Sequence, residues 1–275
     1  MREGMKTLWE TMASNSTSEP KCPICGNDKP KVKVKHPFKD EMTEVVAACE
    51  CEIKEIEEFK KLQKMRERKR QIERILKMSS ELENIREFTF DNYKVRPGNE
   101  VVINEVKKAV DNFENNNGMG LFIFGESGNG KTHATAAGGN ELLRRGYSVI
   151  FLTEKDLLSR LKATNNYNNH ETFSDVMGAA IGADLLIWDD FLSSTRLTGE
   201  EKDWIFQIIN GRERAKRPIW YTSNLTPEEF QSKEIETVLD PKGRTWWRIL
   251  NNTIPIFNRA TNYRKEQVMK RVRGL

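Results

Sequence analysis

The chain has 275 residues, of which 37% are hydrophobic and 31% are charged, with a net charge of +4. This is long enough for one large domain or a main domain plus a smaller one, and too apolar for a wholly disordered protein. No apolar run approaches the ~20 residues of a membrane span, and the N-terminus lacks the apolar core of a signal peptide, so we expect a cytoplasmic protein with no membrane partner.

Residues 1–20 are polar and predict a loose tail. The four cysteines of the chain follow as a C-x2-C pair and a C-x-C pair, namely Cys22, Cys25, Cys49 and Cys51. In a reducing compartment, clustered pairs indicate a metal site rather than disulfides, and four thiolates satisfy tetrahedral Zn²⁺. We therefore predict a small structural zinc module over residues 21–52. His36 could replace one thiolate, and four free or redox-active cysteines are the alternative.

Residues 52–78 predict a helix, because apolar residues recur every three positions and no Gly or Pro interrupts the stretch. The apolar stripe comprises Ile53, Ile56, Phe59, Leu62 and Met65, and most of the remaining positions are charged. Such a pattern is typical of a solvated helix face, and it also suits a partner-binding surface. We take residues 53–87 as a helical linker that leads into the next domain.

Residues 88–275 predict an α/β domain with a central, largely parallel sheet, because helix-like and strand-like segments alternate. Short apolar runs predict strands at 120–124, 148–152, 185–188 and 218–222. Longer periodic segments predict helices at 101–113, 132–145 and 200–214.

The octapeptide GESGNGKT at residues 125–132 fits the phosphate-binding pattern G-x-x-x-x-G-K-[ST]. It directly follows a predicted strand and opens a predicted helix, which is the context that the pattern requires. Backbone N–H groups of such a loop wrap phosphates, the lysine reaches the β and γ phosphates, and the hydroxyl binds Mg²⁺. We predict ATP and Mg²⁺ as cofactors, held by Gly125, Ser127, Gly128, Asn129, Gly130, Lys131, Thr132 and His133.

Two further strand ends carry polar residues suited to phosphate chemistry. Asp189 would hold Mg²⁺ through water, and Asp190 would orient or deprotonate the attacking water. Asn224, after the following strand, would sense the γ-phosphate. The alternatives are a solvent-facing loop for the two acids and an ordinary turn residue for the amide.

The order of these motifs resembles the AAA+ ATPases of the bacterial and phage replicative helicase loaders, of the DnaC and DnaI type. The resemblance covers residues 88–275 and includes the opening Phe90-Asp91-Asn92-Tyr93, the segment 243–249 and the late Asn262-Tyr263-Arg264. It implies an AAA+ P-loop core, with Arg248, or else Arg244, as an arginine finger on a neighbouring subunit's ATP. It also implies Arg264 as a second sensor of the nucleotide.

The resemblance further implies partners. Residues 1–87 would bind the hexameric replicative helicase, and an ATP-dependent oligomer would bind single-stranded DNA. Lys162 could meet a DNA phosphate and Tyr167 could stack on a base, although an ordinary Asn-rich loop explains that segment equally well. The core also resembles the IstB-type transposition helper ATPases, which would bind duplex DNA and a transposase. A small-molecule kinase with a P-loop is a weaker alternative, because it leaves the zinc module without a role.

Overall fold

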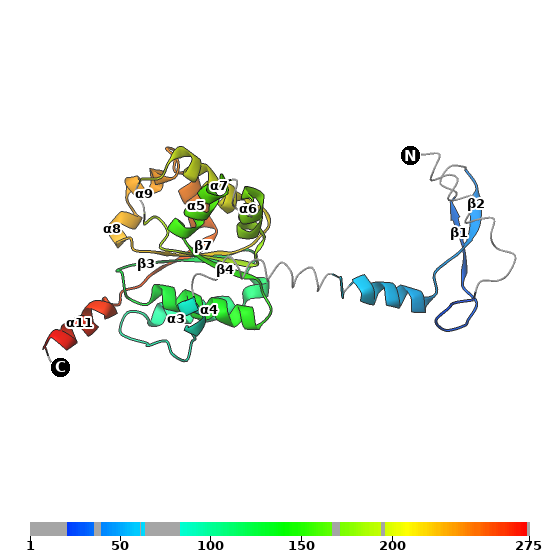
Figure 1. Cartoon of the computed structure of the whole chain (residues 1–275), viewed down its shortest axis with the longest axis horizontal. Coiled ribbons are helices and arrows are strands. Elements are labelled where there is room, and N and C mark those ends of the chain that lie inside the picture. Colours follow the sequence, from blue (N-terminus) through cyan, green and yellow to red (C-terminus); the bar gives the residue numbers. More distant parts are fainter. Residues whose placement is uncertain are drawn as a thin grey trace. The chain divides into compact units, whose positions relative to one another are not determined.

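The computed structural model describes residues 21–35, 40–60, 62–63, 83–166, 171–193 and 196–273. The chain forms two compact units, Met1–Arg70 and Gln71–Leu275 (Figure 1). The predicted tail, His36 and the second half of the predicted 52–78 helix lie outside the described residues.

The first unit contains a two-stranded antiparallel hairpin of β1 (Lys31–Lys35) and β2 (Met42–Val46). Residues 50–60 and 62–63 are helical, as the apolar spacing predicts. Four residues of the apolar stripe, Ile53, Ile56, Phe59 and Leu62, are exposed to solvent, with Phe59 58% exposed. An exposed apolar stripe that includes a Phe is unusual for a merely solvated face and suits contact with another molecule.

The second unit is built on a five-stranded parallel sheet with strand order β4-β5-β6-β3-β7. Its strands are β3 (Gly120–Phe124), β4 (Val149–Thr153), β5 (Leu185–Asp189), β6 (Ile219–Ser223) and β7 (Thr253–Phe257). The first four coincide within one residue with the predicted strands. The expected α/β fold with a central parallel sheet is therefore confirmed.

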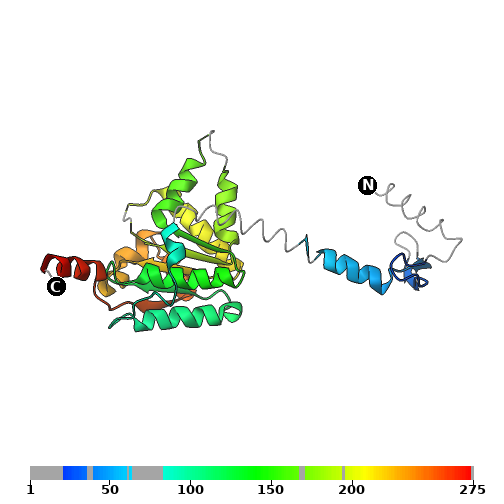
Figure 2. The same cartoon turned by 60° about the horizontal axis from the view of Figure 1, so that its bottom comes forward.

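The helices of this unit cover both faces of the sheet (Figure 2). They are η1 (Glu83–Glu87), α3 (Glu100–Asp111), η2 (Phe113–Asn115), α4 (Lys131–Arg144), α5 (Glu154–Ala163), α6 (Phe173–Gly182), α7 (Gly199–Arg214), α8 (Pro227–Phe230), α9 (Lys233–Val238), α10 (Arg244–Asn251) and α11 (Tyr263–Arg273). In the part of the chain that the structure describes, no helix combines the length and apolar character needed to cross a bilayer.

Each central strand contributes side chains to two separate hydrophobic cores, because alternate side chains point to opposite faces of a sheet. In β3, Leu121 and Ile123 pack with α3 and α4, whereas Phe122 and Phe124 pack with the helices of the other face. Both faces of β3, β5 and β6 are buried, so these strands read as continuous apolar runs. This packing fixes the carboxyl ends of the strands, where Asp189, Asp190 and Asn224 lie.

Arg212 on α7 is fully buried and holds the amino-terminal ends of β5 and β6 together. Its Nη1 donates to the carbonyls of Ala180 and Ala183 at 2.7 and 2.9 Å, and its Nη2 donates to that of Pro218 at 2.7 Å. The guanidinium thus caps the carboxyl end of α6, where the helix dipole favours a cation.

We expect Arg212→Met to destabilise the second unit by about 3 kcal/mol, because it leaves buried carbonyls without donors. Arg212→Lys keeps the positive charge but lacks the planar guanidinium, so it should destabilise the unit less than Arg212→Met does. Urea unfolding followed by Trp fluorescence measures both. An Arg212→Met midpoint equal to that of wild type would contradict this account of the residue.

Candidate nucleotide-binding site

The glycine-rich loop joins β3 to α4, and its backbone needs residues without a Cβ atom. Gly125, Gly128 and Gly130 all have positive φ, at 138°, 70° and 99°. A Cβ atom on Gly125 would lie 2.4 Å from the Asn258 carbonyl oxygen, and one on Gly128 would lie 2.6 Å from Asn262 Oδ1. These three glycines let the loop curl tightly beside the start of α4, as a phosphate cradle requires.

Lys131 is the first residue of α4, and its ammonium group turns back into the loop. Its Nζ donates to the carbonyls of Gly125 and Glu126, both at 2.8 Å, and to Asn224 Oδ1 at 3.0 Å. Burial lowers the pKa of Lys131 to about 8, against the opposing effect of nearby carboxylates, of which Asp190 is the strongest. These acceptors are weaker partners for an ammonium than phosphate oxygens would be.

Asp189 ends β5 and is joined to the loop helix by a hydroxyl. Thr132 Oγ1 donates to Asp189 Oδ1 at 3.0 Å, and the Thr222 hydroxyl donates to the same carboxylate oxygen. Burial raises the pKa of Asp189, while hydrogen bonds from these two threonines oppose that rise. A hydroxyl and a carboxylate in contact at a loop that cradles phosphate are the ligands that Mg²⁺ takes with a nucleotide.

Asp190 adopts a left-handed backbone conformation, with φ of 50°, and its N–H donates to the Thr222 hydroxyl at 3.1 Å. Its carboxylate accepts from Asn224 Nδ2 at 3.1 Å, while Asn224 Oδ1 accepts from Lys131. The amide therefore bridges the ammonium and the second carboxylate. The structure thus brings the predicted loop, acidic pair and amide together at one edge of the sheet. Thr222, which the sequence analysis missed, fixes both acids.

A cavity of about 500 Å³ opens at this edge, lined by loop residues together with Asp190, Asn224 and Arg264. Its other wall comes from residues 88–99, to which the sequence analysis gave no role in nucleotide binding. The Phe88 ring stacks on the His133 ring with centroids 4.4 Å apart, and the Asn92 amide oxygen lies 2.8 Å from His133 Nε2. Burial lowers the pKa of His133, which favours its neutral form.

Tyr93 completes this wall beside the loop. Its buried hydroxyl has no hydrogen-bond partner, and a Cβ atom on Gly130 would lie 3.3 Å from it. Burial raises the pKa of Tyr93 to about 12, so the hydroxyl stays protonated and able to donate. The glycine-rich loop, the buried Lys131 ammonium and the unpartnered Tyr93 hydroxyl line one cavity, and together they fit a nucleotide.

The two finger candidates do not line this cavity. Arg248 donates to Asn210 Oδ1 at 2.9 Å and forms an ion pair with Glu213. Arg244 and Arg248 line a different pocket, together with the exposed Trp247. Arg264 does line the nucleotide cavity, as its expected sensing role requires.

The candidate DNA contacts receive no support from geometry. Lys162 forms an ion pair with Glu201 at 2.8 Å, and Glu201 in turn accepts from the backbone N–H of Thr198 at the start of α7. The Lys162 ammonium is therefore already paired with Glu201, a residue of the capping box of α7. Tyr167 lies outside the described residues. DNA binding at this position stays a prediction.

The four cysteines of the first unit meet at one point. Their sulfur atoms all lie within 4.8 Å of one another, and none forms a disulfide. The Sγ atoms of Cys25 and Cys49 are 3.7 Å apart. A zinc tetrahedron with bonds of about 2.3 Å has sulfur–sulfur edges of about 3.8 Å. The C-x2-C pair sits on a tight turn in which Gly26, with φ of 72°, donates its N–H to the Cys22 carbonyl at 2.9 Å.

The sequence of the chain matches a known protein family. Residues 47–240 match the family described as IstB-like ATP binding protein. The chain is 33% identical over 184 residues to the replicative helicase loader DnaC of Buchnera aphidicola subsp. Baizongia pistaciae (strain Bp), covering 66% of this chain and 74% of the relative. It is 34% identical over 167 residues to the DnaC of Escherichia coli (strain K12), covering 59% of this chain and 66% of the relative.

Among solved structures, the DnaC helicase loader aligns with a TM-score of 0.55 at 21% identity, covering 64% of this chain and 99% of that one. At this identity the likeness shows the fold alone, and it agrees with the expected P-loop core around a central parallel sheet. The match to an ATP-binding family confirms that the chain binds ATP, and the chain is an ATPase. This chain belongs to the IstB-like ATP-binding protein family.

Proposed function

We propose that this protein is an ATP-dependent helicase loader, which binds the replicative DNA helicase and delivers it onto single-stranded DNA when replication begins. The observation that carries the proposal is the 33–34% identity to relatives named replicative helicase loader DnaC. The nucleotide cavity supports it, since it unites the groups needed to bind and hydrolyse ATP. Such a loader acts beside the bacterial chromosome, and therefore in the cytoplasm.

Each residue of the cavity then has a defined task. The loop N–H groups and Lys131 hold the phosphates, and Thr132 with Asp189 would hold Mg²⁺, which neutralises charge on the phosphate oxygens when bound. Asp190 orients the attacking water and accepts its proton. Asn224 contacts both Lys131 and Asp190, so it can report the γ-phosphate to the water-orienting carboxylate.

The cysteine cluster would hold one structural zinc ion in the first unit. All four ligand positions are thiolates, so no coordination position stays open for catalysis. Glu52 supports the cluster, because it accepts the N–H of Cys49 at 3.0 Å and pairs with Lys29 at 2.5 Å. The metal would join the C-x2-C turn to the start of the 50–63 helix.

We expect the purified protein to contain about one zinc per chain. Cys22→Ser should release the metal and unfold the first unit, because metal affinity and folding are coupled in such small modules. ATP affinity should stay at the wild-type value, since the second unit has its own core. Metal analysis by mass spectrometry, with ATP affinity as the internal control, checks this. A gently purified protein without zinc would rule out the site.

The exposed stripe of the 50–63 helix would be part of the helicase-binding surface. We expect immobilised wild-type protein to capture the replicative helicase from a bacterial extract. Phe59→Asp should abolish capture, because it places a charge in the apolar stripe. Lys60→Asp, on the neighbouring exposed position, is the matched control and should retain most of it. Capture of a transposase instead of a helicase would favour the IstB-type helper and refute the loader.

Self-association belongs to the same proposal. Arg248 and Arg244 lie outside the chain's own nucleotide cavity, so they can act on ATP only from a neighbouring copy. An ATP-dependent oligomer would place the fingers of one subunit at the phosphates of the next, and single-stranded DNA would bind to that assembly.

A further inference from the structure

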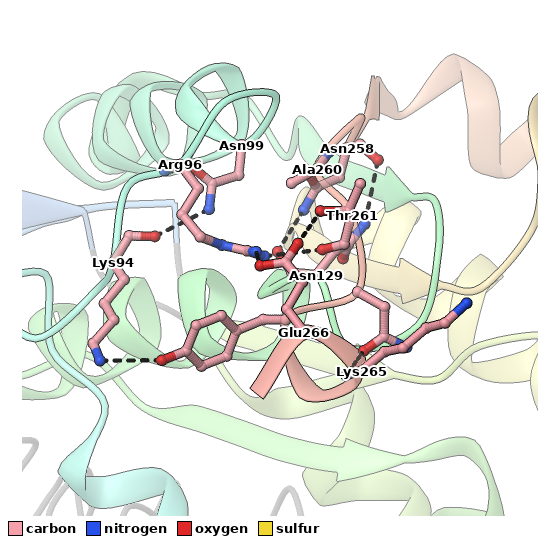
Figure 3. A network of polar contacts seen from close by, with 11 residues as sticks. Lys94, Arg96, Asn99, Asn129, Asn258, Ala260, Thr261, Lys265 and Glu266 are labelled. Atoms are coloured by element: carbon pink, nitrogen blue, oxygen red, sulfur yellow. Dashed lines mark hydrogen bonds and ion pairs between the residues drawn. The ribbon is translucent and has the colours of Figure 1, made fainter. Parts of the chain in front are cut away.

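Three segments that are distant in the sequence meet in a network of polar contacts (Figure 3). They are the loop 94–99 before α3, the glycine-rich loop, and residues 258–266, which lead from β7 into α11. Lys94, Arg96 and Asn99 of this network also line the nucleotide cavity. Arg259 donates its N–H to the Gly98 carbonyl at 3.1 Å, and a Cβ atom on Gly98 would lie 2.7 Å from the backbone nitrogen of Ala260. The first and third segments are therefore in direct backbone contact.

Through its guanidinium, Arg96 contacts Thr261, just before α11, together with Tyr263 and Glu266 in the first turn of that helix (Figure 3). Its Nη1 pairs with Glu266 Oε2 at 3.0 Å, and its Nη2 donates to the Thr261 carbonyl at 2.9 Å. Its guanidinium lies over the Tyr263 ring, 4.8 Å from the centroid. A planar fork can satisfy this combination of an acid, a carbonyl and an aromatic face, whereas an ammonium cannot.

Asn99 holds the loop that carries Arg96 in place. It is 1% exposed, its Oδ1 accepts the backbone N–H of Arg96 at 2.7 Å, and its Nδ2 donates to the Lys94 carbonyl at 3.1 Å. The Lys94 ammonium adds a contact to the Tyr263 hydroxyl at 3.2 Å. The position of Arg96 is therefore set by a buried amide rather than by solvent-exposed contacts.

The other side of the network ties the start of α11 to the glycine-rich loop. Tyr263 donates its N–H to the Gly128 carbonyl at 2.9 Å. The side chains of Asn129 and Asn258 donate to each other's backbone carbonyls, at 3.2 and 3.3 Å. Asn262 caps α11 by accepting the N–H of Lys265 at 3.0 Å. Movement of the loop on binding phosphates would therefore act directly on the first turn of α11.

Beyond this first turn, α11 has little packing that could fix its direction. Val268 and Val272 are 51% and 74% exposed, and the helix leaves the body of the unit at its start (Figure 1). Arg264, in the first turn, lines the nucleotide cavity. The direction of its side chain thus depends on the contacts of the turn itself.

We infer that Arg96 is a positioning residue for nucleotide sensing: it clamps the first turn of α11 so that Arg264 is held at the nucleotide cavity. The inference rests on the proposed role of Arg264 as a sensor. Arg96 acts through Arg264, so its effect on the nucleotide must disappear when Arg264 is absent.

A double-mutant cycle tests this, using the full chain and the equilibrium affinity for ATP. We expect Arg264→Ala and Arg96→Ala each to weaken ATP binding by about tenfold, the effect of losing one charge-assisted contact. The Arg96→Ala/Arg264→Ala double variant should bind no more weakly than Arg264→Ala alone. Arg96→Lys should recover only part of the affinity, because one ammonium cannot serve all three partners.

Arg145→Ala is the matched control, since Arg145 also pairs with acids, Glu141 and Asp111, but lies outside the cavity. Its ATP affinity should equal that of wild type. Glu266→Ala removes the other half of the ion pair and should weaken ATP binding in the same direction as Arg96→Ala, which guards against a folding defect of one variant. Circular dichroism verifies folding throughout.

The outcomes separate the two claims. If Arg264→Ala binds ATP normally, the sensing role itself fails and the clamp with it. If Arg264→Ala is weakened but Arg96→Ala is not, only the clamp is wrong. If the two effects multiply in the double variant, Arg96 contacts the nucleotide directly, and the positioning role is again refuted.

Discussion

Replacing Asp190 with asparagine is expected to lower ATP turnover by about 10²–10⁴-fold while ATP affinity stays close to that of wild type. Asparagine preserves the size of the side chain and can still contact Asn224, which lies 3.1 Å away. It cannot accept a proton from the attacking water. The backbone N–H at position 190 would still donate to Thr222, so the left-handed turn that presents the side chain should persist.

Single-turnover hydrolysis measures the chemical step, and a fluorescent ATP analogue measures binding. Asp111→Asn is the matched control, because Asp111 is an exposed carboxylate on α3 outside the cavity. Lys131→Ala sets the opposite limit and should abolish ATP binding altogether. An Asp190→Asn protein that hydrolyses ATP at the normal rate would transfer the water-orienting role to another group.

Replacing Arg248 with alanine is expected to lower turnover in the assembled state by about 10³–10⁵-fold, the usual contribution of an arginine finger. ATP affinity of the single chain should not change, since Arg248 is held by Asn210 and Glu213 away from the chain's own cavity. The finger must leave these partners to reach a neighbouring subunit, so assembly and hydrolysis would be coupled.

Mixing Arg248→Ala with Lys131→Ala protein provides the decisive readout. At a mixed interface, the first protein supplies an intact nucleotide cavity and the second supplies an intact finger, so part of the activity should return. Arg214→Ala, an exposed arginine on α7, is the control and should retain full activity. If both variants assemble and no activity returns, the finger does not act in trans.

The central sheet was predictable because its strands are buried on both faces and therefore form continuous apolar runs. β7 was not, since it is an edge strand in which Ile254 is 45% exposed and Pro255 interrupts the apolar pattern. The short strands β1 and β2 were also missed. Strand β1 does alternate Lys and Val, a pattern that predicts a strand, but residues 21–52 were interpreted only as a metal module. Strand β2 has no such alternation, and most of its side chains are exposed.

In the candidate site, residues in short sequence motifs were predictable, whereas residues defined by contacts with distant parts of the chain were not. Lys131, Thr132 and the acidic pair belong to short motifs next to recognisable strands, and the structure brings them together. Asn92 and Tyr93 belong to a motif that carries the family resemblance, but their place in the cavity wall was not predicted. That place depends on contacts with His133 and Gly130, which lie about 40 residues further along the chain. Thr222 and Arg96 were missed because their partners lie on other elements, and a single sequence records no such pairing.

The loader function is tested most directly with purified components: the replicative helicase, single-stranded DNA, and this protein with or without ATP. We expect the helicase to associate with DNA faster when wild-type protein and ATP are both present, and we expect Lys131→Ala protein to give no acceleration. A helicase that neither binds this protein nor loads faster in its presence would contradict the account.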